Sequence, residues 1–200
     1  MIISHKYKFV FLHTRKTAGT SIEKALMPHL GPADVCTGSV MDKVPRKNCP
    51  PNLKGHASHV RIKAIFDYWD LSEYHWWCVE RNSYEKAFSD WWFHRIINSR
   101  YTTKLFKAFV EKNELSDWPR YYSAGRFQAE VIQFDKLHEE WPRLMRSLQL
   151  PEIDITKFRC KVAVNRPPLH YVYTDQIKRM VANQCRNEIE AFGYEFPKEV

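Results

Sequence analysis

Cationic and hydroxyl side chains cluster just after the first apolar run of the chain. Residues 13–21 read HTRKTAGTS, in which Lys16 precedes Gly19 and hydroxyl side chains flank the glycine. A helix that begins here would present backbone N–H groups without internal partners, at the positive end of its dipole. Glycine would let the backbone approach a phosphate closely, and lysine would add a mobile positive charge. The segment therefore predicts an anion site, with an ordinary capped helix as the equally open alternative.

The spacing in this segment differs from that of a Walker A loop. A Walker A loop places a first glycine four residues ahead of a Gly-Lys-Ser/Thr core. Here Lys16 comes before Gly19, and residues 13–21 contain no second glycine. A nucleotide-dependent phosphotransferase with an irregular loop stays an alternative, but it should also have metal-binding carboxylates, which the sequence does not reveal.

A second basic segment follows the second apolar run. Residues 76–93 read WWCVERNSYEKAFSDWWF, with Arg81 at the end of the apolar part. Lys86 and Ser89 are three residues apart and would share a helix face. These side chains could converge on a second phosphate, with Arg81 as a bidentate partner. The alternative is an arginine and a serine that simply face solvent.

Apolar periodicity indicates which elements hold these segments. Strands are predicted at residues 7–12, 75–79 and 131–134. One helix is predicted to begin near residues 19–21 and another to cover residues 135–150. Two more helices are predicted to begin after the N-caps Ser83 and Thr174, and Gly193 is predicted to end the last one. Strands that alternate with helices are typical of an α/β fold with a mostly parallel sheet. The 200 residues are expected to form a single domain, residues 1–200.

Composition limits the environment and the partners. The net charge of +8 favours an anionic partner, and a basic nucleic-acid-binding module is a further alternative. No run of about 18 apolar residues is present, and the first residues do not resemble a signal peptide. The five cysteines are scattered, so reduced thiols and a cytoplasmic location are expected. A Cys36–Cys49 disulfide is the open alternative.

Together the two basic segments resemble the sulfotransferases that use 3′-phosphoadenosine 5′-phosphosulfate (PAPS). FLHTRKTAGTS is similar to the 5′-phosphosulfate loop of that family, and VERNSYEKAFSDWW is similar to its 3′-phosphate segment, with the same Arg-to-Ser spacing. GHASHV, residues 55–60, resembles a segment of the uronyl 2-O-sulfotransferase branch, and the C-terminal helix resembles the closing helix of that branch. The ordered phosphate motifs favour a nucleotide over a nucleic acid as the anionic partner.

The resemblance implies a P-loop-like three-layer fold with a central, mostly parallel sheet flanked by helices. It also implies PAPS as the sulfuryl donor, adenosine 3′,5′-bisphosphate (PAP) as the product, and no metal. The implied cofactor-binding residues are Arg15, Lys16, Thr17, Ala18, Gly19, Thr20, Ser21, Arg81 and Ser89.

The same resemblance implies how the reaction would proceed. The acceptor would be a hydroxyl group, expected on a carbohydrate. His56, which follows Gly55, corresponds to the histidine that is the catalytic base of the uronyl branch and would take the hydroxyl proton. Lys16 would stabilise negative charge on the oxygen that bridges sulfur and phosphorus. His13, just ahead of the loop, is expected to have a structural role.

Four positions depart from the family pattern. Arg15 and Ser83 stand where the family has proline, and Lys86 replaces a common arginine. Glu80 places an acid where an apolar residue is usual. This carboxylate would weaken 3′-phosphate binding unless its side chain points away from Arg81, which alternation along a strand permits.

Overall fold

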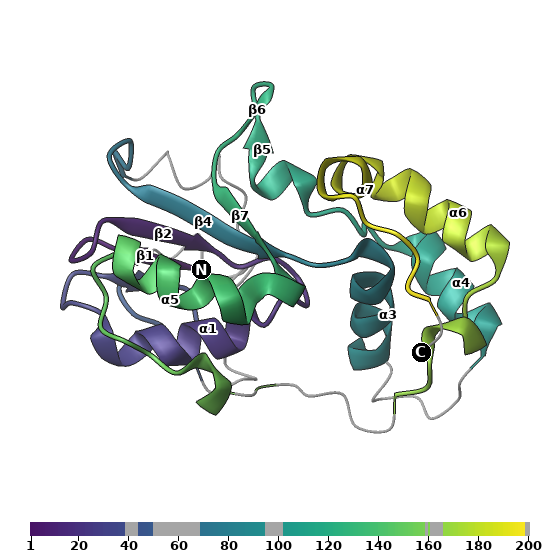
Figure 1. The fold of residues 1–200 in the computed structure, drawn as a ribbon, viewed down its shortest axis with the longest axis horizontal. Helices are drawn as coiled ribbons and strands as arrows, with labels where there is room; N and C mark the ends of the chain where they lie inside the picture. Colours follow the sequence, from purple (N-terminus) through teal and green to yellow (C-terminus); the bar gives the residue numbers. More distant parts are fainter. Residues whose placement is uncertain (39–43, 50–68, 95–101, 159, 161–165, 199–200) are drawn as a thin grey trace. The chain divides into compact units, whose positions relative to one another are not determined.

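The computed structural model describes residues 1–38, 44–49, 69–94, 102–158, 160 and 166–198 (Figure 1). They divide into two compact units, whereas the sequence led us to expect one domain. The first unit comprises Met1–Glu80 and Pro119–Cys160, and the second comprises Arg81–Trp118 and Lys161–Val200. Among the described helices, none is long and apolar enough to cross a membrane.

A mixed five-stranded sheet forms the centre of the first unit. Its strands are β1 (Ile2–Ser4), β2 (Phe9–Leu12), β3 (Val35–Cys36), β4 (His75–Glu80) and β7 (Glu130–Gln133), in the order β3-β1-β2-β4-β7. Strand β4 pairs in parallel with both β2 and β7, while β1 pairs antiparallel with β2 and β3. The α/β class is therefore confirmed, but the mostly parallel sheet is confirmed only in part. The three predicted strands are present, and β1 and β3 are two strands that the sequence did not predict.

Helices α1 (Gly19–Leu26) and α5 (Leu137–Ser147) pack on the same face of this sheet (Figure 1). Side chains at i, i+3 and i+4 of α1 enter the core, as the periodicity predicts. The indole of Trp77 lies at its centre, 4.4 Å from Phe11 and 6.2 Å from Trp141 between ring centroids. Pro142 lies inside α5. A short hairpin of β5 (Tyr122–Ser123) and β6 (Arg126–Phe127) precedes β7.

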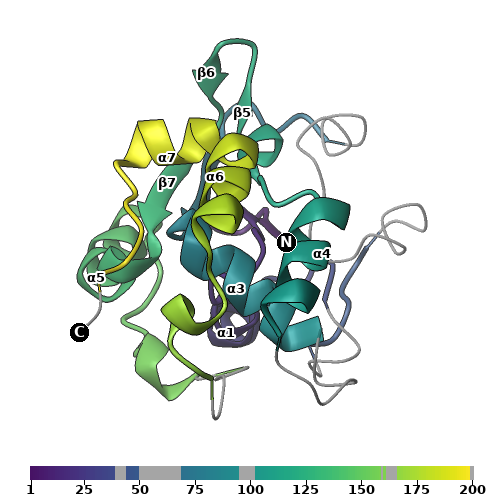
Figure 2. The same ribbon diagram turned by 90° about the vertical axis from the view of Figure 1, so that its right-hand side faces the viewer.

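The second unit is helical. It contains α3 (Ser83–His94), α4 (Thr103–Lys112), α6 (Asp175–Gln184) and α7 (Arg186–Phe192), and α3, α4 and α6 contact one another (Figure 2). Aromatic side chains dominate its core: Tyr84, Phe88, Trp91, Trp92, Phe106 and Tyr173. The tryptophans of α3 thus pack in the interior, where burial of their apolar surface stabilises the fold.

The helix ends test the predicted caps. Thr174 is the N-cap of α6, since its side chain accepts a hydrogen bond from the Ile177 N–H, and Gly193 ends α7 in the left-handed conformation with φ 65°. The predicted cap at Ser83 is wrong. Asn82 has that role, because its Oδ1 accepts from the Tyr84 N–H at 3.1 Å and its carbonyl accepts from the Lys86 N–H. Ser83 is the first residue of the helix itself.

The last predicted helix is divided in two. Cys185 ends α6 and precedes α7 with φ −110° and ψ 28°, outside the helical region. None of the five cysteines, Cys36 and Cys49 included, forms a disulfide.

Candidate functional site

The loop between β2 and α1 is tied to the neighbouring strand. The Thr14 hydroxyl donates to the carbonyl oxygen of Val79 in β4. The Thr17 Oγ1 lies 2.8 Å from the Thr14 Oγ1 and donates to the Thr14 carbonyl at 3.0 Å. Both threonines are fully buried. The Thr17 hydroxyl, which the sequence suggested as a phosphate donor, therefore holds the loop together from inside.

Two residues of this loop have left-handed backbone conformations without being glycine. They are Lys16, with φ 58°, and Ala18, with φ 64°. Such conformations are uncommon for residues with a side chain and cost free energy, and they cluster at binding sites. Left-handed residues interspersed with ordinary ones turn successive N–H groups toward one concavity, which suits an anion. Left-handed residues spaced in this way are characteristic of anion-binding nests.

Helix α1 begins directly after these left-handed residues. Ala18 occupies its N-cap position, no described side chain caps the helix, and no acidic residue lies in its first turn. The first helical hydrogen bond runs from the Ile22 N–H to the Ala18 carbonyl at 3.0 Å. The preceding N–H groups of Gly19, Thr20 and Ser21 therefore lie at the positive end of the helix dipole.

Gly19 is required here by close packing. A Cβ atom at this position would overlap with Cδ2 and Nε2 of the His13 imidazole. The His13 ring is held in turn by Glu23 of α1, with 3.0 Å between Nδ1 and Oε1. Glu23 also accepts a hydrogen bond from the Met1 amino group at 2.5 Å. These contacts give His13 the structural role that we expected from the sequence.

The Glu23 carboxylate is ionised although it is buried. Burial raises its pKa, but attraction to the Met1 amino group and to His13 outweighs burial and lowers the pKa to about 2. The positive charge of the Met1 amino group thereby offsets the negative charge of Glu23.

The remaining loop side chains differ in exposure. Thr20 and Ser21 are 4% and 6% exposed, and the Ser21 Oγ accepts a hydrogen bond from the Cys160 N–H at 3.1 Å. The Ser21 O–H can still donate to a ligand. Arg15 and Lys16 are partly exposed, so their charges are close to solvent.

In the second unit, the Arg81 guanidinium is engaged by a carboxylate. Its Nε and Nη2 both donate to Glu85 Oε2 at 3.0 Å. Ser89 lies one turn beyond Glu85 in α3 and is partly exposed. Lys86 is directed elsewhere, since it is buried 3.5 Å from Asp117 Oδ2. Because Lys86 pairs with Asp117, it does not join Arg81 and Ser89 in the phosphate-binding group that the sequence suggested.

Arg166 is a basic residue that sequence reasoning missed. Its guanidinium lies over the Phe88 ring of α3, 5.2 Å from the centroid. Burial and then the positive charge of Arg81 lower the pKa of Arg166, while Glu85 raises it. The charges of Arg81 and Arg166 therefore interact, and Glu85 offsets part of the repulsion at Arg166. The only signal in the sequence was an arginine before two prolines, which indicates a loop and nothing about its position.

The unusual acid Glu80 has a hydrogen-bond partner within the first unit. The Tyr121 hydroxyl donates to Glu80 Oε2 at 2.9 Å, and Glu80 is fully buried. This contact gives the carboxylate a local role that the sequence did not suggest.

His56, the expected catalytic base, lies outside the described residues, as does the whole segment 55–60. Within the described part of the chain, no three His, Cys, Asp or Glu side chains group as metal ligands do.

No protein-family model matches the chain, and neither a curated protein nor a solved structure matches it. Its function must be inferred from its residues and their geometry.

Proposed function

We propose that the chain is a sulfotransferase that moves a sulfuryl group from PAPS to a hydroxyl acceptor on a carbohydrate. The observation that carries this proposal is the loop before α1, where left-handed Lys16 and Ala18 precede an uncapped helix. A protein tolerates such backbone strain where it builds a binding site. The two basic motifs and their order along the chain support PAPS as the anion.

The 5′-phosphosulfate would lie in this loop. The N–H groups at the start of α1 would donate to the phosphate, together with the hydroxyls of Thr20 and Ser21. Lys16 and Arg15 would supply positive charge. Thr17 would act through its buried hydroxyl, by holding the loop in the binding conformation.

In the transfer step, the acceptor oxygen attacks sulfur while the bond from sulfur to the phosphate oxygen breaks. PAP leaves with the electron pair, and His56 takes the proton of the acceptor hydroxyl. Negative charge develops on the leaving oxygen, and Lys16 would stabilise it. These roles rest on the sequence motifs.

The 3′-phosphate would bind in the second unit, to Arg81 and Ser89. The contact between Arg81 and Glu85 means that the phosphate must compete with this carboxylate for the guanidinium. Arg166 adds a second positive charge close enough to influence the same groups. A second guanidinium near Arg81 favours an anionic ligand.

A thermal-shift titration of the full chain with PAP, with EDTA present, tests the proposal. A ligand at about 100 times its Kd stabilises a fold by roughly 2.7 kcal/mol. PAP should therefore raise the melting temperature without metal. A response to Mg·ATP and none to PAP would indicate a phosphotransferase instead. Salt-sensitive binding to RNA or DNA without any nucleotide response would indicate a nucleic-acid-binding module.

Labelled PAPS then tests the reaction itself. Transfer of label to saccharide acceptors, compared with phenols and peptides, is the expected result. PAP binding without transfer to any hydroxyl acceptor would contradict the enzymatic proposal.

A further inference from the structure

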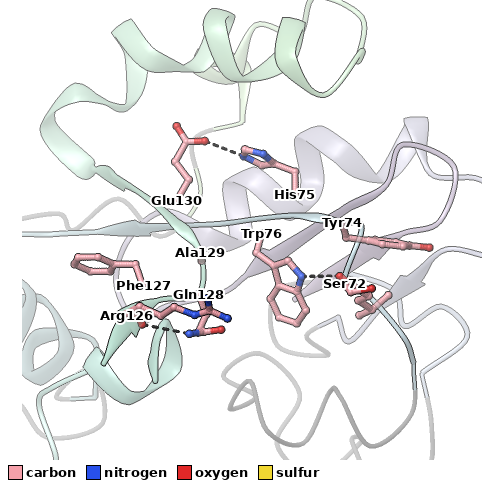
Figure 3. Close-up of a pocket in the computed structure, with 10 residues that line it drawn as sticks. Ser72, Tyr74, His75, Trp76, Arg126, Phe127, Gln128, Ala129 and Glu130 are labelled. Atoms are coloured by element: carbon pink, nitrogen blue, oxygen red, sulfur yellow. Dashed lines mark hydrogen bonds and ion pairs between the residues drawn. The ribbon is translucent and has the colours of Figure 1, made fainter. Parts of the chain in front are cut away.

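A pocket of about 730 Å³ opens in the first unit, away from the phosphate loop. Two stretches of chain line it, residues 71–76 and residues 126–130 (Figure 3). Its volume lies within the range of roughly 300–1,000 Å³ that is typical of small-molecule sites.

The pocket and the phosphate loop lie at opposite ends of the same strands. Strand β4 begins at His75, beside the pocket, and its six residues span about 20 Å at roughly 3.3 Å each. Because β2 and β4 are parallel, with Leu12 opposite Cys78, the loop after β2 lies beyond the far end of β4. The pocket is therefore a separate site.

Neighbouring residues of β4 point to opposite faces of the sheet. His75 and Glu130 contact each other on one face, with 2.8 Å between Nε2 and Oε2, and Arg143 of α5 also binds Glu130 there. Trp76, Arg126 and Gln128 lie on the other face (Figure 3). The carboxylate of Glu130 is thus engaged away from the space beside Trp76.

The charge that is left in the pocket is positive. Arg126 is exposed and has no ion-pair partner among the described residues. A guanidinium in this state is suited to bind a carboxylate or sulfate with two parallel hydrogen bonds.

Aromatic rings held in fixed positions form the apolar part of the pocket. The Trp76 indole donates to the Leu71 carbonyl at 3.1 Å, and the Tyr74 hydroxyl lies 2.8 Å from His5 Nδ1. Phe127 is 45% exposed although it is large and apolar, and its ring stacks on Tyr121. An exposed aromatic side chain beside an arginine that pairs with no described residue is typical of a binding surface.

Polar groups alternate with these rings. The Gln128 amide nitrogen donates to the carbonyls of Ser123 and Arg126, so its orientation is fixed. Its amide oxygen accepts no hydrogen bond from the described residues and can accept one from a ligand hydroxyl. A ligand that matches this lining has apolar ring faces, hydroxyl edges and an anionic group.

We propose that this pocket binds an anionic saccharide, which carries a carboxylate or sulfate for Arg126. A sugar ring would pack against the exposed ring of Phe127, while Trp76, which is only 9% exposed, would form part of the pocket wall. The inference deepens the proposed function and rests on its carbohydrate acceptor: the pocket would hold a part of the acceptor chain remote from the hydroxyl that reacts.

Tryptophan fluorescence, measured while the full chain is titrated with a saccharide, tests the pocket. Two tetrasaccharides are compared: one is sulfated and contains uronic acid residues, and the other is neutral. The sulfated one should bind, and the neutral one should bind far more weakly. Arg126→Ala should weaken binding about 10- to 100-fold, the usual loss for a hydrogen bond to a charged group. Phe127→Ala should also weaken it, and Arg126→Lys should retain part of the affinity.

Arg146→Ala is the matched control, since Arg146 is an exposed arginine of α5 outside the pocket. It should leave saccharide binding within about twofold of the parent chain. An equal loss in both arginine variants would overturn the pocket, because general charge attraction would then explain binding. Equal binding of the neutral saccharide would show that the ligand need not be anionic and would overturn the ligand class. The ligand class would also be overturned if the chain bound an oligonucleotide but neither saccharide, and Arg126→Ala abolished that binding.

The PAP thermal shift separates this inference from the proposed function. Arg126→Ala and Phe127→Ala should not change it. If the chain bound the saccharide but not PAP, the pocket would remain a glycan-binding site, but it would no longer be assigned to the acceptor of a sulfotransferase. PAP binding without saccharide binding would overturn the pocket and leave the nucleotide site intact.

Discussion

The imidazole of His13 lies where a side chain at residue 19 would have to be, so Gly19 can only be glycine. This contact joins the end of β2 to the first residue of α1. It holds the backbone of the proposed phosphate loop at both of its ends. Glu23, which binds His13 from within α1, completes the connection.

Gly19→Ala should disturb this loop. Overpacking a tight site costs about 1–3 kcal/mol, so the melting temperature should fall. PAP affinity should fall as well, because the N–H groups at the start of α1 would move. Calorimetry and PAP titration measure the two effects.

The control is Gly31→Ala, where an added Cβ would lie 3.1 Å from Lys6 Cβ, about 1 Å farther than the corresponding contact at Gly19. This variant should cost less stability than Gly19→Ala and should leave PAP affinity unchanged. A Gly19→Ala variant with unchanged stability and PAP affinity would show that the close contact with His13 is unimportant.

Lys16→Ala should lower kcat strongly and PAP affinity less. The backbone N–H groups that bind the phosphate remain, whereas the charge that stabilises the leaving oxygen is lost. Steady-state kinetics and PAP titration separate the two effects. Lys24→Ala, in the last turn of the same helix, removes an equal charge and should change neither. A raised KM for PAPS with unchanged kcat would exclude Lys16 from the transfer step.

Arg81→Ala and Glu85→Gln should have opposite effects on PAP affinity. Arg81→Ala removes a contact to the 3′-phosphate, at a cost of about 1.5–3 kcal/mol. Glu85→Gln removes the carboxylate that competes for the guanidinium, so PAP should bind more tightly. Calorimetric titration of both variants measures the difference.

Adenosine 5′-phosphosulfate, which lacks the 3′-phosphate, is the control ligand for both variants. Its affinity should change little in either. If Arg81→Ala weakened both ligands equally, the cause would be damage to the second unit rather than loss of a phosphate contact.

Stability should depend on the ionisation of Glu23 at acidic pH. The pKa of this carboxyl is lowered from 4.5 to about 2 in the folded state, so ionised Glu23 stabilises the fold above the unfolded pKa. That stabilisation, on the order of 3 kcal/mol, should be lost as the pH falls from about 4.5 to about 2.

Glu23→Gln should remove this part of the pH dependence, as urea unfolding at several pH values would reveal. Glu152→Gln, at an exposed position, should retain it. A Glu23→Gln variant that kept the full loss of stability in this pH range would show that other carboxyls cause it.

His56→Ala should lower turnover by about 10²–10⁴-fold while PAP affinity and melting temperature stay unchanged, as expected for loss of a general base. The motif of residues 55–60 carries this prediction. His59→Ala is the nearby control and should lose much less activity. An inactive His59→Ala beside an active His56→Ala would show that the base had been assigned to the wrong histidine.

The sequence by itself determined those elements that depend on neighbouring residues. Apolar runs predicted β2, β4 and β7, side-chain periodicity predicted α1, and periodicity together with the capping Thr174 predicted α6. Turn and cap preferences act within a few residues, so they are readable without the fold. The proposed phosphate motifs are local in the same sense, since each lies at a junction between a strand and a helix.

Tertiary structure decided which partner each polar side chain has. Lys86 pairs with Asp117, Glu80 with Tyr121, and His13 with Glu23 and Gly19. The first two pairs join residues about thirty or forty positions apart, whose contact depends on how the elements pack. Short strands such as β1 form because neighbouring strands supply their hydrogen bonds, rather than because of their own three residues. The pocket beside Trp76 has the same origin, because parallel pairing of β4 and β7 brings residues 71–76 next to residues 126–130.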